Sequence, residues 1–196
     1  MTPPIILASG SAGRRELLGR LRLPFEVRVP GIDESRLPGE PPAALALRLS
    51  REKALAVART LPAGLVIGSD QVAECGDILL GKPGTPEAAC AQLALASGRR
   101  VRFWTGIALA DVESGNVVVD VVRCDVYFRQ LDPGEIARYV EVDAPLECAG
   151  SFRSEGLGIS LFERLDTPDP TSLVGLPLIR LCAMLRAAGV GIPPAA

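Results

Sequence analysis

Apolar and polar residues alternate along the chain in blocks that predict both helices and strands. Two short runs, 5–8 and 65–67, are apolar throughout and end in small residues, which is typical of buried strands that lead into tight turns. Between and after these runs, apolar residues recur at helical spacing, and several of the segments begin at Ser, Thr, Asp or Pro. The pattern predicts helices over 12–23, 43–60, 86–96, 133–142 and 177–188.

The other predicted strands lie mostly in the second half of the chain. Residues 25–29 alternate apolar and charged side chains, and three further strand-like segments follow after Ser97 and Gly98. These strands are expected at 25–29, 101–109, 116–123 and 124–130. Because strands alternate with helices early and cluster later, we expect an α/β or α+β fold with a mixed sheet, in one domain over residues 1–196.

The composition narrows the class of protein. Apolar residues make up 48% of the 196 residues and charged residues 22%, which is typical of a soluble globular protein. No stretch has the roughly 18 consecutive apolar residues of a membrane helix, and the first residues lack the basic leader of a signal peptide. The net charge of −2 argues against binding to a nucleic-acid polymer. We therefore expect a cytoplasmic protein without a membrane partner.

Histidine and cysteine usage restricts the chemistry. The chain has no histidine, so a Ser-His triad and a His-ligated metal are excluded. Its five cysteines are scattered and form no C-x-x-C pair, which predicts reduced thiols and neither a disulfide framework nor a zinc site. Any catalysis must therefore depend on carboxylates, lysines, arginines and a metal ion.

The segment 8–15 has the pattern of an anion-binding site. It leads from a predicted strand through Ser9 and Ser11 to the start of a helix, where free backbone N–H groups and the helix dipole favour an anion. Arg14 and Arg15 oppose this dipole unless an anion compensates them. The alternative is a solvated first turn in which Arg15 pairs with a nearby carboxylate.

Carboxylates and lysines supply the remaining candidates. Asp33 and Glu34 lie in a polar loop, and Asp70 follows the second apolar run, so we expect it at the exit of a strand. Hydrolysis of a phosphoanhydride without histidine needs a metal ion and a carboxylate that holds the ion or accepts a proton from water. Lys53 and Lys82 are candidates for binding phosphate. Exposed loop carboxylates and solvated lysines remain the alternative for each of them.

Six short motifs follow one another along nearly the whole chain. They are Ser-x-Ser at 9–11 with Arg14, Gly-Ile-Asp-Glu-Ser at 31–35, Arg-Glu-Lys-Ala at 51–54, Gly-Ser-Asp-Gln at 68–71, Gly-Lys-Pro at 81–83 and Val-Gly-Leu-Pro-Leu at 174–178. In this order they resemble the Maf family of nucleoside triphosphate pyrophosphatases. Six ordered motifs are far more specific than any one of them.

The resemblance implies a Maf/ITPase-like fold, in which helices flank a central mixed sheet and two lobes enclose a nucleotide. It also implies cleavage of a nucleoside triphosphate to the monophosphate and pyrophosphate, a divalent cation (Mg²⁺ or Mn²⁺) as cofactor, and a homodimer. Asp70 would be the catalytic carboxylate, as proton acceptor, metal ligand or both, and Glu34 would help bind the metal. The residues that would hold the triphosphate are Ser9, Ser11, Arg14, Lys53 and Lys82.

Three positions, Gly13, Gln71 and Glu155, divide the family by substrate. At these positions the chain resembles the branch that acts on 7-methyl-GTP. The branch that hydrolyses dTTP and UTP carries an arginine, a threonine and a glutamine there. Because Gly13 has no side chain, a group that stacks on the base must come from elsewhere.

The chemistry of the bases agrees with this for Glu155. One carboxylate can accept hydrogen bonds from the adjacent N1–H and N2–H donors of guanine, whereas uracil and thymine flank their single N–H with two carbonyls. Phe103 or Trp104 would supply the stacking partner. The alternative for Glu155 is an ion pair with Arg153 or Arg164.

Two other functions stay open. The same pyrophosphatase chemistry could act on other nucleotides, such as dTTP and UTP, to clean the nucleotide pool. The chain could also be a nucleotide-binding regulator of septum formation without turnover, an association that the resemblance carries. The pattern does not decide between plain and methylated guanine.

Overall fold

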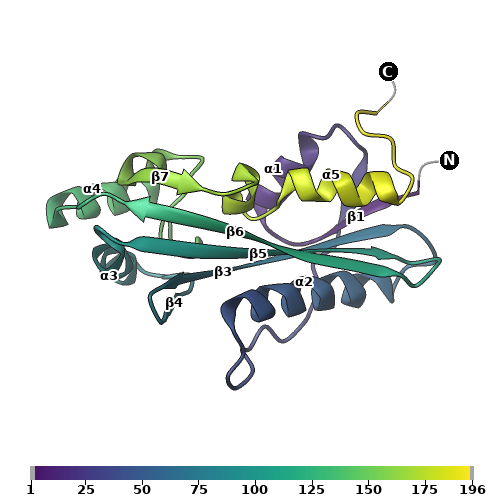
Figure 1. The fold of residues 1–196 in the computed structure, drawn as a ribbon, viewed down its shortest axis with the longest axis horizontal. Helices are drawn as coiled ribbons and strands as arrows, with labels where there is room; N and C mark the ends of the chain where they lie inside the picture. Colours follow the sequence, from purple (N-terminus) through teal and green to yellow (C-terminus); the bar gives the residue numbers. More distant parts are fainter. Residues whose placement is uncertain (1–2, 195–196) are drawn as a thin grey trace.

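The framework of the protein is a mixed β-sheet, described by a computed structural model that covers residues 3–194 (Figure 1). Within these residues the sheet has seven strands in the order β2-β1-β3-β5-β6-β7, and β4 also pairs with β3. The strands are β1 Ile5–Ala8, β2 Phe25–Val27, β3 Leu65–Cys75, β4 Ile78–Leu80, β5 Arg100–Asp111, β6 Val117–Phe128 and β7 Phe162–Asp166.

Parallel and antiparallel pairing meet at β3. Strand β1 runs parallel to both β2 and β3, whereas β3, β5, β6 and β7 pair antiparallel in succession. Strands β5 and β6 form one long hairpin with a register that runs from Ala110 opposite Val117 to Arg100 opposite Tyr127. The predicted fold class, α/β or α+β with a mixed sheet, is confirmed.

Helices cover both faces of this sheet. In residues 3–194 the helices are α1 Ala12–Gly19, α2 Pro42–Ala58, α3 Pro86–Ala96, α4 Pro133–Asp143 and α5 Leu178–Ala187, with 3₁₀ turns η1 Leu157–Leu161 and η2 Pro170–Val174. Helix α2 packs on one face through Ala54 and Val57, which contact Val66 and Ala108 of the sheet. Figure 1 shows it below the strands, with α1 and α5 above them.

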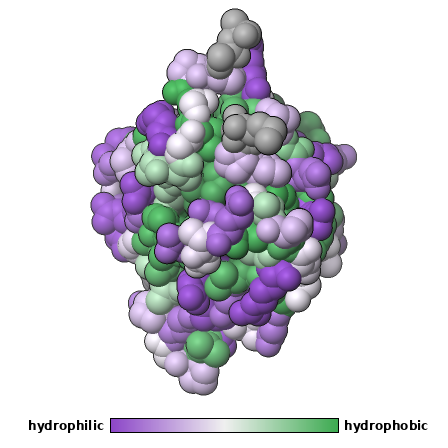
Figure 2. Space-filling model, turned by 90° about the vertical axis from the view of Figure 1, so that its right-hand side faces the viewer, coloured by the Kyte–Doolittle hydropathy of each residue, from purple (hydrophilic) through white to green (hydrophobic). Residues whose placement is uncertain are grey.

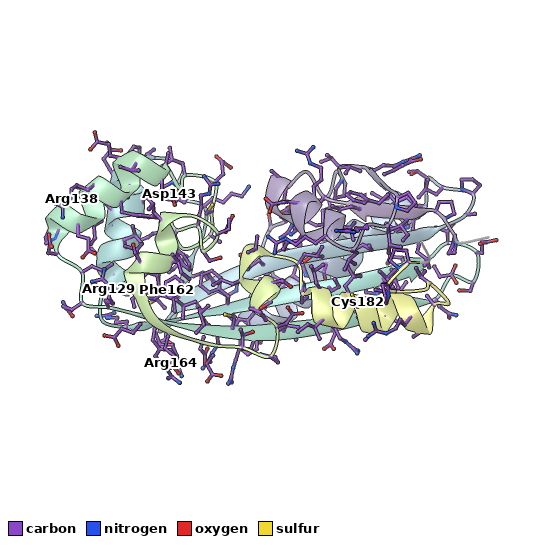
Figure 3. The ribbon with its side chains drawn as sticks, turned by 90° about the horizontal axis from the view of Figure 1, so that it is seen from above. Arg129, Arg138, Asp143, Phe162, Arg164 and Cys182 are labelled. Atoms are coloured by element: carbon purple, nitrogen blue, oxygen red, sulfur yellow. The ribbon has the colours of Figure 1, made fainter. Side chains whose placement is uncertain are left out.

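The opposite face of the sheet carries two hydrophobic cores. Ile67 and Ile107 belong to a core with α1 and α5, and Ala73 and Phe103, farther along the same strands, belong to a core with α3 and α4. All four residues share one face, because side chains alternate along each strand and Ala73 of β3 pairs directly with Phe103 of β5. Figure 3 shows the two groups of helices at opposite ends of the molecule.

Several strand boundaries differ from the prediction. Strand β3 continues to Cys75, so Asp70 lies inside the strand and not at its exit. The strands expected at 116–123 and 124–130 are one strand, β6, because β5 pairs with it along its whole length. Strand β2 ends at Val27, since its parallel neighbour β1 has only four residues.

Short elements account for the other differences. Helix α1 ends at Gly19, earlier than predicted, and α5 begins at Leu178 with Pro177 as the residue before its first turn. Strands β4 and β7 and the two 3₁₀ turns were not predicted, because segments of three to five residues have no clear hydrophobic period.

The predicted helix caps are confirmed. Ser11, Thr85 and Asp132 each cap a helix by accepting a hydrogen bond from the backbone N–H three residues later. All five cysteines are free. Among residues 3–194, every helix is too short or too polar to span a bilayer. At the end of the molecule where the termini lie, hydrophilic and hydrophobic residues are interspersed on the surface (Figure 2).

Candidate active site

The candidate site lies along a stretch of β3 that has a strand neighbour on one side only. Strand β1 pairs with β3 up to Gly68, and β4 pairs with it from Ala73. Between them, residues 69–72 pair only with β5, so the other edge of β3 is open. Because side chains alternate between faces, Asp70 points toward α2 and Gln71 toward the opposite face. Both side chains therefore flank the same open edge.

Two glycines allow α2 to lie directly on the sheet next to this edge. A Cβ atom on Gly68 would lie 2.1 Å from the carbonyl oxygen of Ser50, and one on Gly106 would lie 2.2 Å from that of Ala46. Both distances are far below van der Waals contact, so only glycine fits while α2 keeps its position. This close packing brings Lys53, one turn beyond Ser50, to Asp70.

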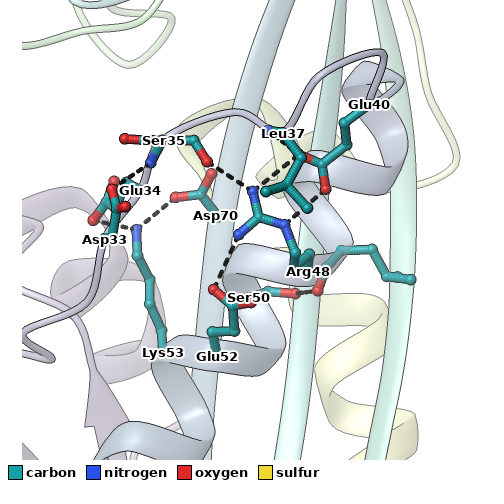
Figure 4. A network of polar contacts seen from close by, with 11 residues as sticks. Asp33, Glu34, Ser35, Leu37, Glu40, Arg48, Ser50, Glu52, Lys53 and Asp70 are labelled. Carbon is teal, nitrogen blue, oxygen red and sulfur yellow. Dashed lines mark hydrogen bonds and ion pairs between the residues drawn. The ribbon is translucent and has the colours of Figure 1, made fainter.

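Lys53 lies between two carboxylates (Figure 4). Its Nζ atom is 2.6 Å from Oδ1 of Asp70 and 2.9 Å from Oε1 of Glu34. Lys53 and Asp70 are buried, whereas Glu34 is exposed. Burial raises the pKa of Asp70, although the positive charges of Lys53 and Arg14 partly oppose this. Asp70 therefore takes up a proton more readily than a solvated aspartate does.

An arginine of α2 fixes the loop that carries Glu34 (Figure 4). Arg48 donates to both carboxylate oxygens of Glu40, from Nε at 2.7 Å and from Nη2 at 2.9 Å. Nη2 also donates to the backbone carbonyl of Ser35 at 2.9 Å. The hydrogen bond from Arg48 lowers the pKa of Glu40. Asp33, the other acidic candidate of this loop, accepts a hydrogen bond from the Ser35 N–H and does not line the cavity described below.

The segment between β1 and α1 holds Arg14 next to the two carboxylates. The Ser9 hydroxyl oxygen accepts hydrogen bonds from the Ser11 backbone N–H at 3.2 Å and from Nη1 of Arg14 at 3.3 Å. Nε of Arg14 donates to the carbonyl of Gly175 at 2.8 Å. Burial lowers the pKa of Arg14, and the charges of Asp70 and Glu34 counteract this. A cationic group is therefore held beside Asp70 by neutral partners.

On the other face of β3, Gln71 bonds to the segment around η2. Its Nε2 atom donates to the carbonyl oxygens of Ser172 at 2.9 Å and Leu173 at 3.1 Å, and to the hydroxyl of Thr105 at 3.1 Å. Ser69 donates to the carbonyl of Gly175 in the same segment. The chain just before α5 thus positions side chains of both β1–α1 and β3.

The remaining predicted residues lie toward the α3–α4 end of the molecule. Lys82 has a side chain that is 66% exposed and lies 3.4 Å from a carboxylate oxygen of Glu147. The loop that carries Glu155 is fixed by Tyr139, whose hydroxyl oxygen accepts a hydrogen bond from the Arg153 backbone N–H at 3.0 Å. Lys82 and Glu155 therefore lie on loops at the mouth of the site.

The alternative ion pairs of Glu155 are not formed. Its carboxylate accepts a hydrogen bond from the Ser154 hydroxyl at 3.3 Å. The guanidinium of Arg164 lies over the ring of Tyr127 instead, and Figure 3 shows Arg164 at the edge of the sheet formed by β7. Among residues 3–194, neither Arg153 nor Arg164 forms a salt bridge with Glu155. The carboxylate is free to accept hydrogen bonds from a ligand.

Of the two aromatic residues considered for stacking, only Phe103 borders the site. Phe103 lines the cavity together with Phe152, and the two rings meet edge to face at 5.5 Å between centroids. Trp104 lies on the opposite face of β5, donates a hydrogen bond to Glu74 and is covered by Arg102. The suggestion of Trp104 as a stacking partner is wrong in this conformation.

These side chains surround one cavity of about 940 Å³. The predicted site residues that line it are Ser9, Ser11, Gly13, Arg14, Glu34, Lys53, Asp70, Gln71, Lys82 and Glu155. The volume is in the range of small-molecule sites, roughly 300–1,000 Å³. Cations, free backbone N–H groups and two carboxylates on one wall can bind a polyanion and activate a water molecule next to it.

The donor set for a metal ion is small. Among residues 3–194, no three His, Cys, Asp or Glu side chains cluster as a metal site would require. Glu34 and Asp70 provide two carboxylates, and both bond to Lys53. Mg²⁺ typically takes one or two carboxylates and completes its shell with water and phosphate oxygens. Two carboxylates next to a phosphate site fit such an ion.

Sequence reasoning missed four residues that hold the site together. Thr105 and Ser69 are fully buried polar residues, and Ser172 and Gly175 present backbone carbonyls to the site. Thr105 is the one uncharged polar residue within the apolar strand segment 101–109, which is a signal that could have identified it. Gly175 belongs to the last of the six motifs, but its contact with Arg14 depends on the fold.

Comparisons with known proteins show the family of the chain. A family model described as Maf-like protein matches residues 4–188. Curated relatives named 7-methyl-GTP pyrophosphatase come from Pseudomonas putida, at 54% identity over 97% of this chain and 99% of that protein, and from Pseudomonas aeruginosa, at 56% over 97% and 100%. Another, from Xanthomonas campestris pv. campestris, is 54% identical over 98% of this chain and 100% of that protein.

A solved structure shows a more distant likeness. The nucleoside-triphosphatase / dITP/XTP pyrophosphatase from Mycobacterium abscessus aligns with a TM-score of 0.48 and 18% identity, over 94% of this chain and 97% of that one.

Proposed function

Because this chain belongs to the Maf family, we propose that it is a nucleoside triphosphate pyrophosphatase that converts 7-methyl-GTP to 7-methyl-GMP and pyrophosphate. The relatives that carry this name match the chain over nearly its full length, which supports a hydrolase acting on nucleotide anhydrides. The observation that carries the proposal is the contact between buried Asp70 and Lys53 in a cavity that all the predicted substrate-binding residues line.

In this proposal the chemistry takes place next to Asp70. Water attacks the α-phosphorus, a new P–O bond forms, and the bond from the α-phosphorus to the α–β bridging oxygen breaks, so that pyrophosphate leaves. Asp70 accepts the proton of the attacking water, for which a carboxylate with a raised pKa is suited. Arg14 and Lys53 stabilise negative charge on the phosphate oxygens, and Ser9 and Ser11 line the same wall.

A divalent ion, Mg²⁺ or Mn²⁺, is proposed as the cofactor. Bound to Glu34 and Asp70, it would neutralise charge on the phosphate oxygens. Lys53 would then exchange part of its contact with the two carboxylates for a contact with phosphate. Asp70 could serve as proton acceptor, as metal ligand or as both.

We assign recognition of the base to the part of the cavity that lies toward α3 and α4. Glu155 has no ion-pair partner among residues 3–194 and can accept hydrogen bonds from the N1–H and N2–H donors of guanine. Phe103 and Phe152 lie buried beneath this part of the cavity and give it an apolar floor. Lys82, at the mouth, can exchange Glu147 for a phosphate oxygen.

Pyrophosphate release from a panel of nucleotides tests the proposal. Wild-type protein should release pyrophosphate from 7-methyl-GTP faster than from GTP, UTP or dTTP, and a chelator should abolish the release. Asp70→Asn should lower kcat by about 10²- to 10⁴-fold, the usual contribution of general acid–base catalysis. Glu113→Gln, which changes an exposed carboxylate in the turn between β5 and β6, outside the cavity, is the control and should keep kcat.

The outcomes separate the open alternatives. Equal rates on 7-methyl-GTP, UTP and dTTP would refute base selection by Glu155. Tight nucleotide binding without release from any member of the panel would favour a regulator. A homodimer, which the family resemblance implies, stays a prediction that sedimentation or light scattering would check.

A further inference from the structure

The amide nitrogen of Gln71 is held by three groups that can only accept a hydrogen bond from it. Two are the backbone carbonyl oxygens of Ser172 and Leu173, at 2.9 and 3.1 Å. The third is the hydroxyl of Thr105, at 3.1 Å. Thr105 donates its single hydroxyl hydrogen to the Ser172 carbonyl at 2.9 Å, so only its lone pairs are available to Gln71. Chemistry alone therefore sets which end of the amide faces these groups.

It follows that the amide oxygen of Gln71 faces the other way. Within residues 3–194 no group donates a hydrogen bond to this oxygen. It is not among the buried side-chain atoms without a partner, so the oxygen itself is not buried. It is therefore accessible from the cavity that Gln71 lines. A rotation of the amide by 180° would bring the oxygen against two carbonyl oxygens and lose the hydrogen bonds of the nitrogen. Gln71 thus offers a ligand a fixed acceptor.

We propose that Thr105 is a positioning residue for base selection, because its hydroxyl accepts from the Gln71 amide and also donates to the Ser172 carbonyl, and so helps to hold Gln71 with its oxygen toward the substrate. Thr105 is fully buried and lies directly across from Gln71 in the pairing of β3 with β5, so it acts through Gln71. The inference rests on the proposed pyrophosphatase function.

Two acceptors on the cavity wall select the class of base. The oxygen of Gln71 and the carboxylate of Glu155 both line the cavity. They favour a base whose edge carries adjacent imino and amino donors, as guanine does, and disfavour uracil, whose edge carries two carbonyls. Methylation at N7 leaves these donors in place.

Two substitutions at Thr105 separate the hydroxyl from the shape of the side chain. Thr105→Val keeps the shape and removes the hydroxyl, and Thr105→Ser keeps the hydroxyl. For each protein, kcat and KM are measured by pyrophosphate release from 7-methyl-GTP, GTP and UTP. In Thr105→Val we expect the ratio of kcat/KM for 7-methyl-GTP to that for UTP to fall about 5-fold, the effect of one hydrogen bond. The fall should come from KM, and Thr105→Ser should keep the wild-type ratio.

The same data contain the results that would overturn the inference. An unchanged ratio in Thr105→Val, or an equal loss for all three nucleotides, would show that Thr105 has only a structural role. Gln71→Met, which keeps the length and removes the oxygen, should lower the ratio as well, and an unchanged ratio in Gln71→Met overturns the inference even if Thr105→Val does not fold. If the wild-type protein shows no preference among the nucleotides or releases no pyrophosphate, the proposed function fails too. If the wild-type protein is selective and Gln71→Met keeps the same ratio of kcat/KM values, only this inference is overturned.

Discussion

Gly106 provides the sharpest test of how the fold creates the site. It lies directly across from Asp70 in the pairing of β3 with β5, under helix α2. In Gly106→Ala the added Cβ atom would lie 2.2 Å from the carbonyl oxygen of Ala46 and 2.9 Å from the hydroxyl oxygen of Ser50. The nearest neighbour is backbone, so a change of side-chain rotamer cannot remove the clash. Helix α2 must move away from the sheet.

The required movement sets the size of two effects. Restoring a contact of about 3.5 Å needs a shift of roughly 1 Å at Ala46. Overpacking of this kind costs about 1–3 kcal/mol, and for a chain of this size each kcal/mol lowers Tm by about 2–4 °C. We therefore expect Tm to fall by roughly 2–12 °C. The contact of 2.6 Å between Lys53 and Asp70 should also lengthen, because Lys53 moves with α2, and kcat should fall about 10-fold or more.

Thermal unfolding and pyrophosphate release, both measured on purified protein, check the two effects. Gly19→Ala is the matched control, because a Cβ atom there meets nothing within 4 Å and the residue lies at the end of helix α1. The control should keep Tm and kcat or raise Tm slightly. An unchanged Tm in Gly106→Ala would refute the close packing of α2. A lowered Tm with unchanged kcat at a temperature well below it would refute the link between α2 and the chemistry.

Three further predictions concern the charged groups of the site and of the loop that carries Glu34. Because burial raises the pKa of Asp70 above 3.8 in the metal-free protein, an NMR titration of its carboxyl without Mg²⁺ should find a midpoint above 3.8, and a midpoint at or below 3.8 would contradict this. The same shift should make wild-type protein lose stability relative to Asp70→Asn as pH rises from 3.8 through the raised pKa of Asp70. The reason is that the Asp70 carboxyl loses its proton at a lower pH in the unfolded chain than in the folded protein. Urea unfolding at a series of pH values measures this loss of stability. In Arg48→Lys the lysine cannot form the bidentate contact with Glu40, so the loop that carries Glu34 should loosen. The Mg²⁺ concentration for half-maximal activity should then rise several-fold. The substitution of an exposed arginine, Arg51→Lys, is the control, and an unchanged Mg²⁺ dependence in Arg48→Lys would argue against this role of Arg48.

The parts of the fold that sequence predicts well are those with local causes. Ser11, Thr85 and Asp132 cap helices as expected, because a cap needs only a side chain and a backbone N–H three residues away. The length of β3 was not predicted, because Ser69, Asp70 and Gln71 interrupt the apolar run and resemble a turn. In the structure these polar groups find partners on α2, β5 and the segment before α5, which local sequence cannot show.

The candidate site depends even more on distant pairing. Family motifs pointed to ten residues that line one cavity, but the reason for their convergence is the open edge of β3. That edge exists because β1 stops at Ala8, opposite Gly68, and β4 resumes pairing only at Ala73. No feature of the segment 68–73 itself predicts where β1 stops pairing with β3 or where β4 begins to pair with it. Register also decides the stacking candidates, since Phe103 shares a face with Thr105 and Trp104 does not.

The motif Gly68 to Gln71 acquires a physical meaning from this geometry. An open strand edge exposes consecutive side chains on both faces, so each of the four residues can perform a different task. Gly68 gives α2 room to approach, Ser69 bonds to the segment before α5, Asp70 meets Lys53, and Gln71 presents its amide on the base side. A strand paired along this edge would fill the space beside residues 69–72, where the cavity lies. The short β1, which ends where the motif begins, therefore leaves the room that the site needs.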